Sequence, residues 1–139
     1  MDWYERSQIP PEPEESSVIL SEINLADLKF KMPLNTRDFY MEVMVNVGKF
    51  DELWKKDPDF YVSPGGIGQI HNRYEGFGEF LKRGEEIEMP IASVTSFGTV
   101  QFTNGRHRFA FLRDLGLREI PICMDKESVK FARQSGVLA

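Results

Sequence analysis

The amino-acid sequence predicts one compact α/β (α+β) domain. Its 139 residues suit a single domain, and 41% of them are hydrophobic and 12% aromatic, which is enough to fill a core. Short stretches of alternating apolar residues are interleaved with stretches in which apolar residues recur every three or four positions; these patterns indicate strands and helices. We expect a flexible, acidic, proline-rich arm over residues 1–17 and a single domain over residues 18–139.

The N-terminal part predicts short extended segments. The arm contains Ile9-Pro-Pro-Glu-Pro-Glu-Glu15, where proline blocks helix and removes hydrogen-bond donors. A strand is expected over residues 17–20, one helical turn over 23–28, and a second short strand over 29–32 that Pro33 ends.

Two helices are predicted in the middle of the chain. The first spans residues 39–54, with capping residues over 35–38 and a break near Gly48. A brief strand over residues 60–62 and the turn Ser63-Pro-Gly-Gly66 follow. The second helix spans 68–83 and contains Gly76 and Gly78, which either weaken it or permit close packing.

The C-terminal part predicts a hairpin, a helix, a strand and a last helix. Met89–Val94 and Thr99–Thr103 form the hairpin, and the next helix places Phe109, Leu112 and Leu115 inward before Gly116 ends it. In the strand over 119–124, Pro121 favours an edge or a strand end. Residues 127–134 form the last short helix.

Composition excludes several classes of protein. The net charge of −5 disfavours a general duplex-DNA coat, which needs a basic face. Cys123 is alone, so it has no disulfide partner and is expected to be a buried structural thiol; with His71 and His107 it gives too few ligands for structural zinc. Neither a membrane-length apolar run nor a signal-peptide pattern is present, which favours a cytoplasmic protein without a membrane partner.

The segment Thr103-Asn-Gly-Arg-His-Arg108 is the most informative in the chain. It predicts a tight turn that opens a helix, where free backbone N–H groups and the positive end of the helix dipole favour an anion. Two arginines at that position repel the dipole unless an anion is bound. We therefore expect a phosphate site. The residues expected to form it are Thr103, Asn104, Gly105, Arg106, His107 and Arg108.

Other polar residues near this site have weaker assignments. His107 is the candidate general acid or base, and Arg37 and Arg73 are candidates for a second wall. The motif contains no carboxylate, Asp114 falls at the far end of the helix, and no metal site is predicted. We expect the glutamates at positions 79, 85, 86 and 88 to form a solvated run.

The order of hairpin, turn, basic helix start and proline-bearing strand resembles the ParB/sulfiredoxin-like superfamily. The resemblance lies in Met89-Pro-Ile-Ala-Ser-Val94, in Phe102–Gly116 and in Ile120-Pro-Ile122. It implies a small mixed sheet flanked by helices and a pocket for nucleotide or phosphate at the helix start. Arg106 stands where sulfiredoxins carry cysteine, so sulfinic reductase chemistry is not expected. Small stand-alone members occur on plasmids and phages.

Two functions follow as expectations. The first is a nucleotide- or phosphate-binding domain, with hydrolysis of nucleotides or nucleic-acid phosphodiesters as a further activity and ATP or CTP with Mg²⁺ as the implied ligands. The alternative is a non-catalytic protein of a mobile element that binds and inhibits another protein. Expected partners are therefore a nucleotide or phosphate ligand, and beyond that a nucleic acid or a protein target.

Overall fold

The computed structural model describes residues 23, 25–34 and 39–139. A four-stranded mixed sheet forms its centre in the order β2-β6-β4-β5. Antiparallel pairs join β2 to β6 and β4 to β5, whereas β4 and β6 run parallel. The bounds of these strands are Tyr40–Asn46 (β2), Ile91–Val94 (β4), Val100–Asn104 (β5) and Glu119–Asp125 (β6).

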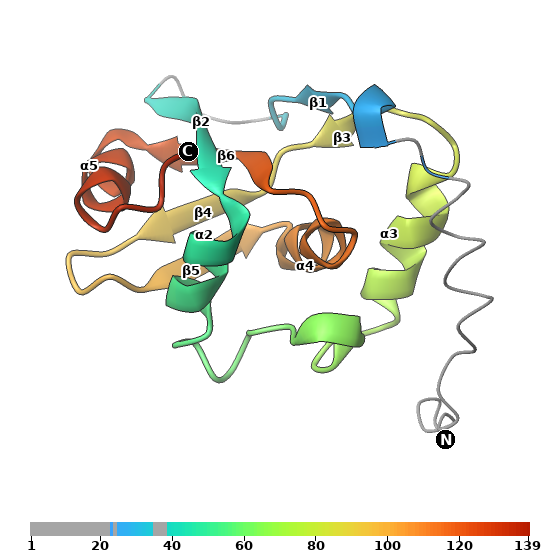
Figure 1. Cartoon of the computed structure of the whole chain (residues 1–139), viewed down its shortest axis with the longest axis horizontal. Helices are drawn as coiled ribbons and strands as arrows, with labels where there is room; N and C mark the ends of the chain where they lie inside the picture. Colours follow the sequence, from blue (N-terminus) through green and yellow to red (C-terminus); the bar gives the residue numbers. More distant parts are fainter. Residues whose placement is uncertain (1–22, 24, 35–38) are drawn as a thin grey trace.

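In the described part of the chain, four α-helices accompany the sheet, which confirms the predicted α/β (α+β) class. Figure 1 shows α4 lying between the sheet and α3, with α5 beyond the opposite end of the sheet. A second sheet pairs β1 with β3 in parallel. None of the described helices is both long and apolar enough to cross a bilayer. The remaining bounds are η1 Leu25–Asp27, β1 Phe30–Lys31, α2 Val47–Trp54, η2 Pro64–Gly66, α3 Arg73–Leu81, β3 Ile87–Glu88, α4 Arg106–Asp114 and α5 Lys126–Gln134.

The prediction of a helix over residues 39–54 is wrong for the first half of that range. Residues 40–46 form β2 and pair with β6 along the whole strand. The apolar side chains of Val43, Val45 and Val47 fit a period of two as well as a helical period, and β-branched residues favour strands. Asn46 marks the change to helix, because its Oδ1 accepts the Lys49 N–H at 2.9 Å as a helix cap. Gly48 therefore lies in the first turn of α2 and breaks nothing.

The position of β6 also corrects the sequence prediction. Pro121 favours an edge strand or a strand end; β6 is no edge strand, because it lies between β2 and β4, and Pro121 is its third residue. Alternate residues of a strand direct their N–H groups to opposite neighbours. Cys123 donates its N–H to the Pro90 carbonyl on the β4 side at 2.9 Å, so the nitrogen of Pro121, two residues earlier, faces the same side. The missing donor therefore leaves the β2–β6 ladder intact.

Two further differences lie in the middle of the chain. The helix predicted over 68–83 begins only at Arg73, because His71 and Asn72 adopt left-handed backbone angles with φ of 52° and 54°. Residues 60–62 form no strand but belong to an irregular loop that runs over residues 57–72. The hairpin, the helix after it and the last helix are confirmed to within a few residues. The predicted arm, the strand over 17–20 and the caps over 35–38 lie outside the described residues.

The core is built around aromatic rings from the sheet and helices. The ring centroids of Trp54 and Phe102 lie 4.8 Å apart, and those of Phe50 and Phe109 lie 5.4 Å apart. Phe109 and Leu112 are fully buried on α4, as their spacing predicts. Cys123 is also buried, in accord with a structural thiol. The last residues close the outer edge of β2, where Asn46 N–H donates to the Val137 carbonyl and Ala139 N–H to the Met44 carbonyl.

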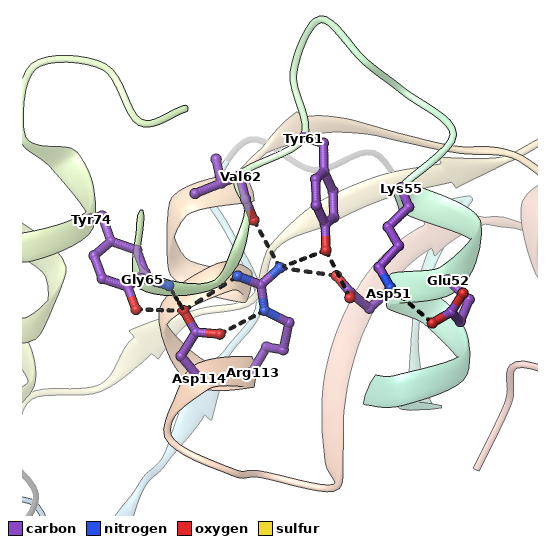
Figure 2. Close-up of polar contacts among 9 residues, drawn as sticks. All are labelled: Asp51, Glu52, Lys55, Tyr61, Val62, Gly65, Tyr74, Arg113 and Asp114. Atoms are coloured by element: carbon purple, nitrogen blue, oxygen red, sulfur yellow. Dashed lines mark hydrogen bonds and ion pairs between the residues drawn. The ribbon is translucent and has the colours of Figure 1, made fainter. Parts of the chain in front are cut away.

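Arg113 holds together segments that are distant in sequence (Figure 2). Its Nη1 contacts Asp51 Oδ1 on α2 at 3.0 Å and the Val62 carbonyl of the loop at 2.8 Å, and its Nε contacts Asp114 Oδ1 at 2.8 Å. Tyr61 donates its hydroxyl to Asp51 Oδ2 at 2.9 Å. The Arg113 side chain is only 9% exposed, so these contacts are largely shielded from water. We call this group the Arg113 clamp.

Asp114 extends the clamp to α3. Its Oδ2 accepts hydrogen bonds from the Gly65 N–H at 3.0 Å and from the Tyr74 hydroxyl. Burial, and then the hydrogen bond to Asp51, raises the pKa of Tyr61 to about 12. Burial and the bond to Asp114 raise the pKa of Tyr74 as well. Both tyrosines therefore remain hydrogen-bond donors at neutral pH.

The clamp predicts a large loss of stability for Arg113→Met. This change removes the cation and leaves the Asp51 carboxylate, 11% exposed, without its charge partner. Breaking a buried pair in this way costs about 3 kcal/mol. The free energy of unfolding from urea titration measures it.

Lys55→Met is the matched control. Lys55 pairs with Glu52 at 3.1 Å, but these side chains are 50% and 69% exposed. A surface pair contributes less than about 1 kcal/mol. Equal losses for the two variants would show that the clamp is no stronger than a surface contact.

Candidate phosphate site

A pocket of about 900 Å³ lies between α3, the segment leading into β3, and the turn from β5 to α4. All six residues of the predicted phosphate motif line it, and so does Arg73. Arg37 lies outside the described residues. The lining residues are Lys31, Phe60, His71, Asn72, Arg73, Gly76, Phe77, Phe80, Arg83, Glu85, Glu86, Glu88, Phe102, Thr103, Asn104, Gly105, Arg106, His107 and Arg108.

Gly105 makes the turn from β5 into α4. Its φ of 90° lies in the left-handed region, which favours glycine. A Cβ at this position would also lie 2.8 Å from Pro90 Cα. Both constraints require glycine. Its lack of a side chain allows the start of α4 to lie against Pro90, the residue before β4.

The first turn of α4 presents free backbone donors. Within the described residues, the N–H groups of Arg106, His107 and Arg108 have no hydrogen-bond acceptor, and no side chain caps the helix. The first intrahelical bond is the one from Phe109 N–H to the Gly105 carbonyl. This end of α4 therefore has the N–H groups and the positive dipole end that bind anions.

Arg106 and Arg73 place two cations at this helix start. Arg106 Nη1 donates to the Phe60 carbonyl at 2.8 Å, and its guanidinium lies 5.4 Å from the centre of the Phe60 ring. Burial, and then the charge of Arg73, lowers the pKa of Arg106. The two arginines thus repel each other across the pocket, and an anion between them would relieve this repulsion.

Arg108 contributes a third guanidinium, which is more enclosed. Its Nε donates to the Glu88 carbonyl at 3.0 Å, whereas its buried Nη2 has no acceptor within the part of the chain that the structure describes. Burial lowers the pKa of Arg108, and the charge of Glu88 opposes that effect. Arg108 therefore joins β3 to the site and retains an unused donor.

His107 is buried, at 7% exposure, and accepts a hydrogen bond on Nε2 from the Ile70 N–H at 3.3 Å. Burial, followed by the charges of Arg106 and Arg73, lowers the pKa of His107 to about 4. The imidazole is thus neutral at pH 7, and because Nε2 accepts, its proton lies on Nδ1. General acid or base catalysis would need Nε2 to exchange the Ile70 N–H for a proton of the substrate. The catalytic role of His107 stays a prediction.

The structure adds residues that sequence reasoning did not assign to the site. Phe60, Phe77 and Phe80 give the pocket aromatic surface, although the sequence placed Phe60 only in a short strand and Phe77 only in a helix. The glutamates at 85, 86 and 88 line the pocket, although Glu85 and Glu86 remain solvent-exposed as expected. These residues come from separate elements, and no local sequence pattern indicates that the fold brings them together. No group of three or more His, Cys, Asp or Glu that could hold a metal ion occurs among the described residues.

Comparisons with known proteins establish the fold but no family. Neither a protein-family profile nor a curated protein matches the chain. A solved structure of similar fold is that of Oncogenic Suppression Activity Protein, a plasmid fertility inhibition factor. It aligns with a TM-score of 0.57 and 20% sequence identity, over 71% of this chain and 58% of that one. The chain thus matches less than two thirds of that protein's length.

The depressed pKa of His107 predicts that stability falls with pH. The unfolded chain binds a proton at this imidazole near pH 6.5, but the folded protein does so only near pH 4. The unfolded state therefore binds more protons between these values, and acidification favours unfolding. Between pH 7 and pH 4 this effect should remove roughly 2–3 kcal/mol, measured by urea titration.

His107→Gln should remove this part of the pH dependence, because the amide oxygen can still accept the Ile70 N–H and does not titrate. His71→Gln serves as the control, since His71 lines the same pocket but is exposed whereas His107 is buried. Parallel stability profiles for the wild type and His107→Gln would contradict the prediction.

Proposed function

We propose that the protein binds a phosphate group at the start of α4, as the terminal group of a nucleotide or of a nucleic acid. The observation that supports this most is that three arginines (Arg73, Arg106 and Arg108) line one pocket with the first turn of α4, whose N–H groups have no acceptor among the described residues. Phosphate accepts charge-assisted hydrogen bonds from both kinds of donor. Its charge would also offset the repulsion among the arginines.

Membership of the ParB/sulfiredoxin-like superfamily is part of the same proposal. It is supported by the sequence of elements from β4 through β6, in which a hairpin leads to a glycine turn, a basic helix start and a strand that carries Pro121. We further propose that the protein hydrolyses the bound phosphate ester. The first substrates to test are ATP and CTP, each in the presence of Mg²⁺. Water would attack the phosphorus atom, and His107 would accept the proton of that water on Nε2 once the Ile70 N–H has released it.

A second candidate function is inhibition of another protein by a mobile-element protein. It is supported by the likeness in fold to a plasmid fertility inhibition factor. Phe97 offers a contact for such a partner, because it is 87% exposed at the tip of the β4–β5 hairpin. The tip is held rigid, since the Thr95 and Thr99 hydroxyls lie 2.7 Å apart and Lys56 Nζ donates to the Gly98 carbonyl.

Phosphate binding predicts that Arg106→Ala weakens the affinity for ATP, CTP and pyrophosphate by about tenfold, the loss of one charge-assisted contact. Arg73→Ala should have a similar effect. Isothermal titration calorimetry at low salt, with and without Mg²⁺, measures both. Arg106 and Arg73 suit this test better than Arg108, whose bond to the Glu88 carbonyl also supports the fold.

Arg118→Ala is the matched control, because it removes the same charge from an exposed position that does not line the pocket. Its affinities should stay within about twofold of the wild type, since Arg118 does not line the pocket and would make no contact with the ligand. If the wild type binds none of the three ligands, the phosphate site is refuted and protein inhibition becomes the leading function.

A further inference from the structure

Helix α3 contains two glycines, Gly76 and Gly78, in a stretch of nine residues. Glycine is the least favourable residue in a helix interior apart from proline, because it loses the most backbone freedom on folding. A glycine in such a position therefore calls for a reason, either in packing or in function.

Packing explains Gly78 completely. A Cβ at this position would lie 2.6 Å from Phe111 Cζ and 2.8 Å from Phe111 Cε2. The Phe111 ring is fixed from two sides, by contacts with Tyr74 at 4.8 Å and with Phe77 at 5.9 Å between ring centroids. Any side chain at Gly78 would thus force α3 away from α4.

No such reason applies to Gly76. A Cβ there would have no described atom within 4 Å, and its φ is not in the left-handed region. Gly76 does, however, line the pocket together with Arg73, Phe77 and Phe80. Residues three or four apart share one face of a helix, so Gly76 lies in the middle of the face that α3 turns to the pocket.

We infer that Gly76 is a specificity-determining residue, which keeps space in the pocket for the organic part of a phosphate ester. This inference rests on the proposed phosphate site. With the phosphate at the start of α4, beside Arg106, the space left by the missing side chain at Gly76 lies along α3 next to Arg73. The organic group would contact the helix backbone there.

The surrounding residues indicate the chemistry of that group. Phe60, Phe77 and Phe80 line the pocket, and Phe60 is 57% exposed, so its ring is open to contact. Aromatic side chains favour flat apolar groups, which they contact face to face or edge to face. A phosphate ester of a flat ring system fits both the cationic end and this aromatic wall, and nucleotides are the probes of that class.

The experiment compares Gly76→Ala and Gly76→Leu with Gly48→Ala. Gly48 is a helix glycine away from the pocket, where a Cβ would make only an ordinary contact of 3.6 Å with Asn46 Oδ1. Both alanine variants should raise the melting temperature, because alanine favours helix. Calorimetry then gives the affinities for pyrophosphate, ATP and CTP.

We expect Gly76→Leu to weaken binding of ATP or CTP by about tenfold or more through overpacking, with a smaller loss for Gly76→Ala. Pyrophosphate has no organic part, so its affinity should stay within about twofold in every variant. Gly48→Ala should bind all three ligands as the wild type does. The raised melting temperature of Gly76→Ala ensures that its loss of affinity does not come from unfolding.

Each other outcome has a distinct meaning. If a nucleotide binds both Gly76 variants as tightly as the wild type, the inference is overturned while the phosphate site stands. The same holds if pyrophosphate binds the wild type but neither nucleotide does, or if the Gly76 variants weaken pyrophosphate as much as the nucleotide. If no ligand binds the wild type, the proposed function itself fails.

Discussion

The Arg113 clamp is the interaction on which the rest of the structure depends. One guanidinium joins α2 through Asp51, the loop through the Val62 carbonyl, and the end of α4 through Asp114. Asp114 then holds α3 through the Tyr74 hydroxyl. The loop over residues 57–72 has only local backbone hydrogen bonds and no strand pairing with the sheet, so these contacts tie it to the helices. Removing the clamp would release that loop and the start of α3 together.

The clamp and the pocket lie at opposite ends of the same helix. Arg113 and Asp114 end α4, whereas Gly105 and Arg106 begin it. Tyr74, held by the clamp, is the immediate neighbour of Arg73, and the loop that the clamp fixes also supplies the Phe60 carbonyl that holds Arg106. Contacts of the clamp thus hold the segments that carry Arg73 and the Phe60 carbonyl, at the end of α4 away from the pocket. This arrangement separates the residues that would bind the anion from those that position them.

Local patterns predicted the turn and helix that carry the candidate site better than they predicted the rest of the framework. The turn at Gly105 and the helix behind it follow from residues adjacent in sequence, and Phe109 and Leu112 are buried as their spacing indicates. The first half of the helix predicted over 39–54 failed because valines two apart suit a strand equally well, and pairing with β6 decided between the two. The aromatic side of the pocket could not be predicted for a similar reason, because Phe60 comes from the loop and Phe77 and Phe80 come from α3. Asp51 and Arg113, 62 residues apart, show in the same way that a clamp between distant segments leaves no trace in local periodicity.

The last three residues have a consequence for solubility. Val137, Leu138 and Ala139 run antiparallel to the outer edge of β2 and satisfy the Asn46 N–H and the Met44 carbonyl. An open edge strand is a template on which a second chain can add its own strand, and Met41 and Met44 beside it are exposed apolar residues. By pairing with β2 over residues 44–46, these three residues would block the addition of a second strand at that end of the edge.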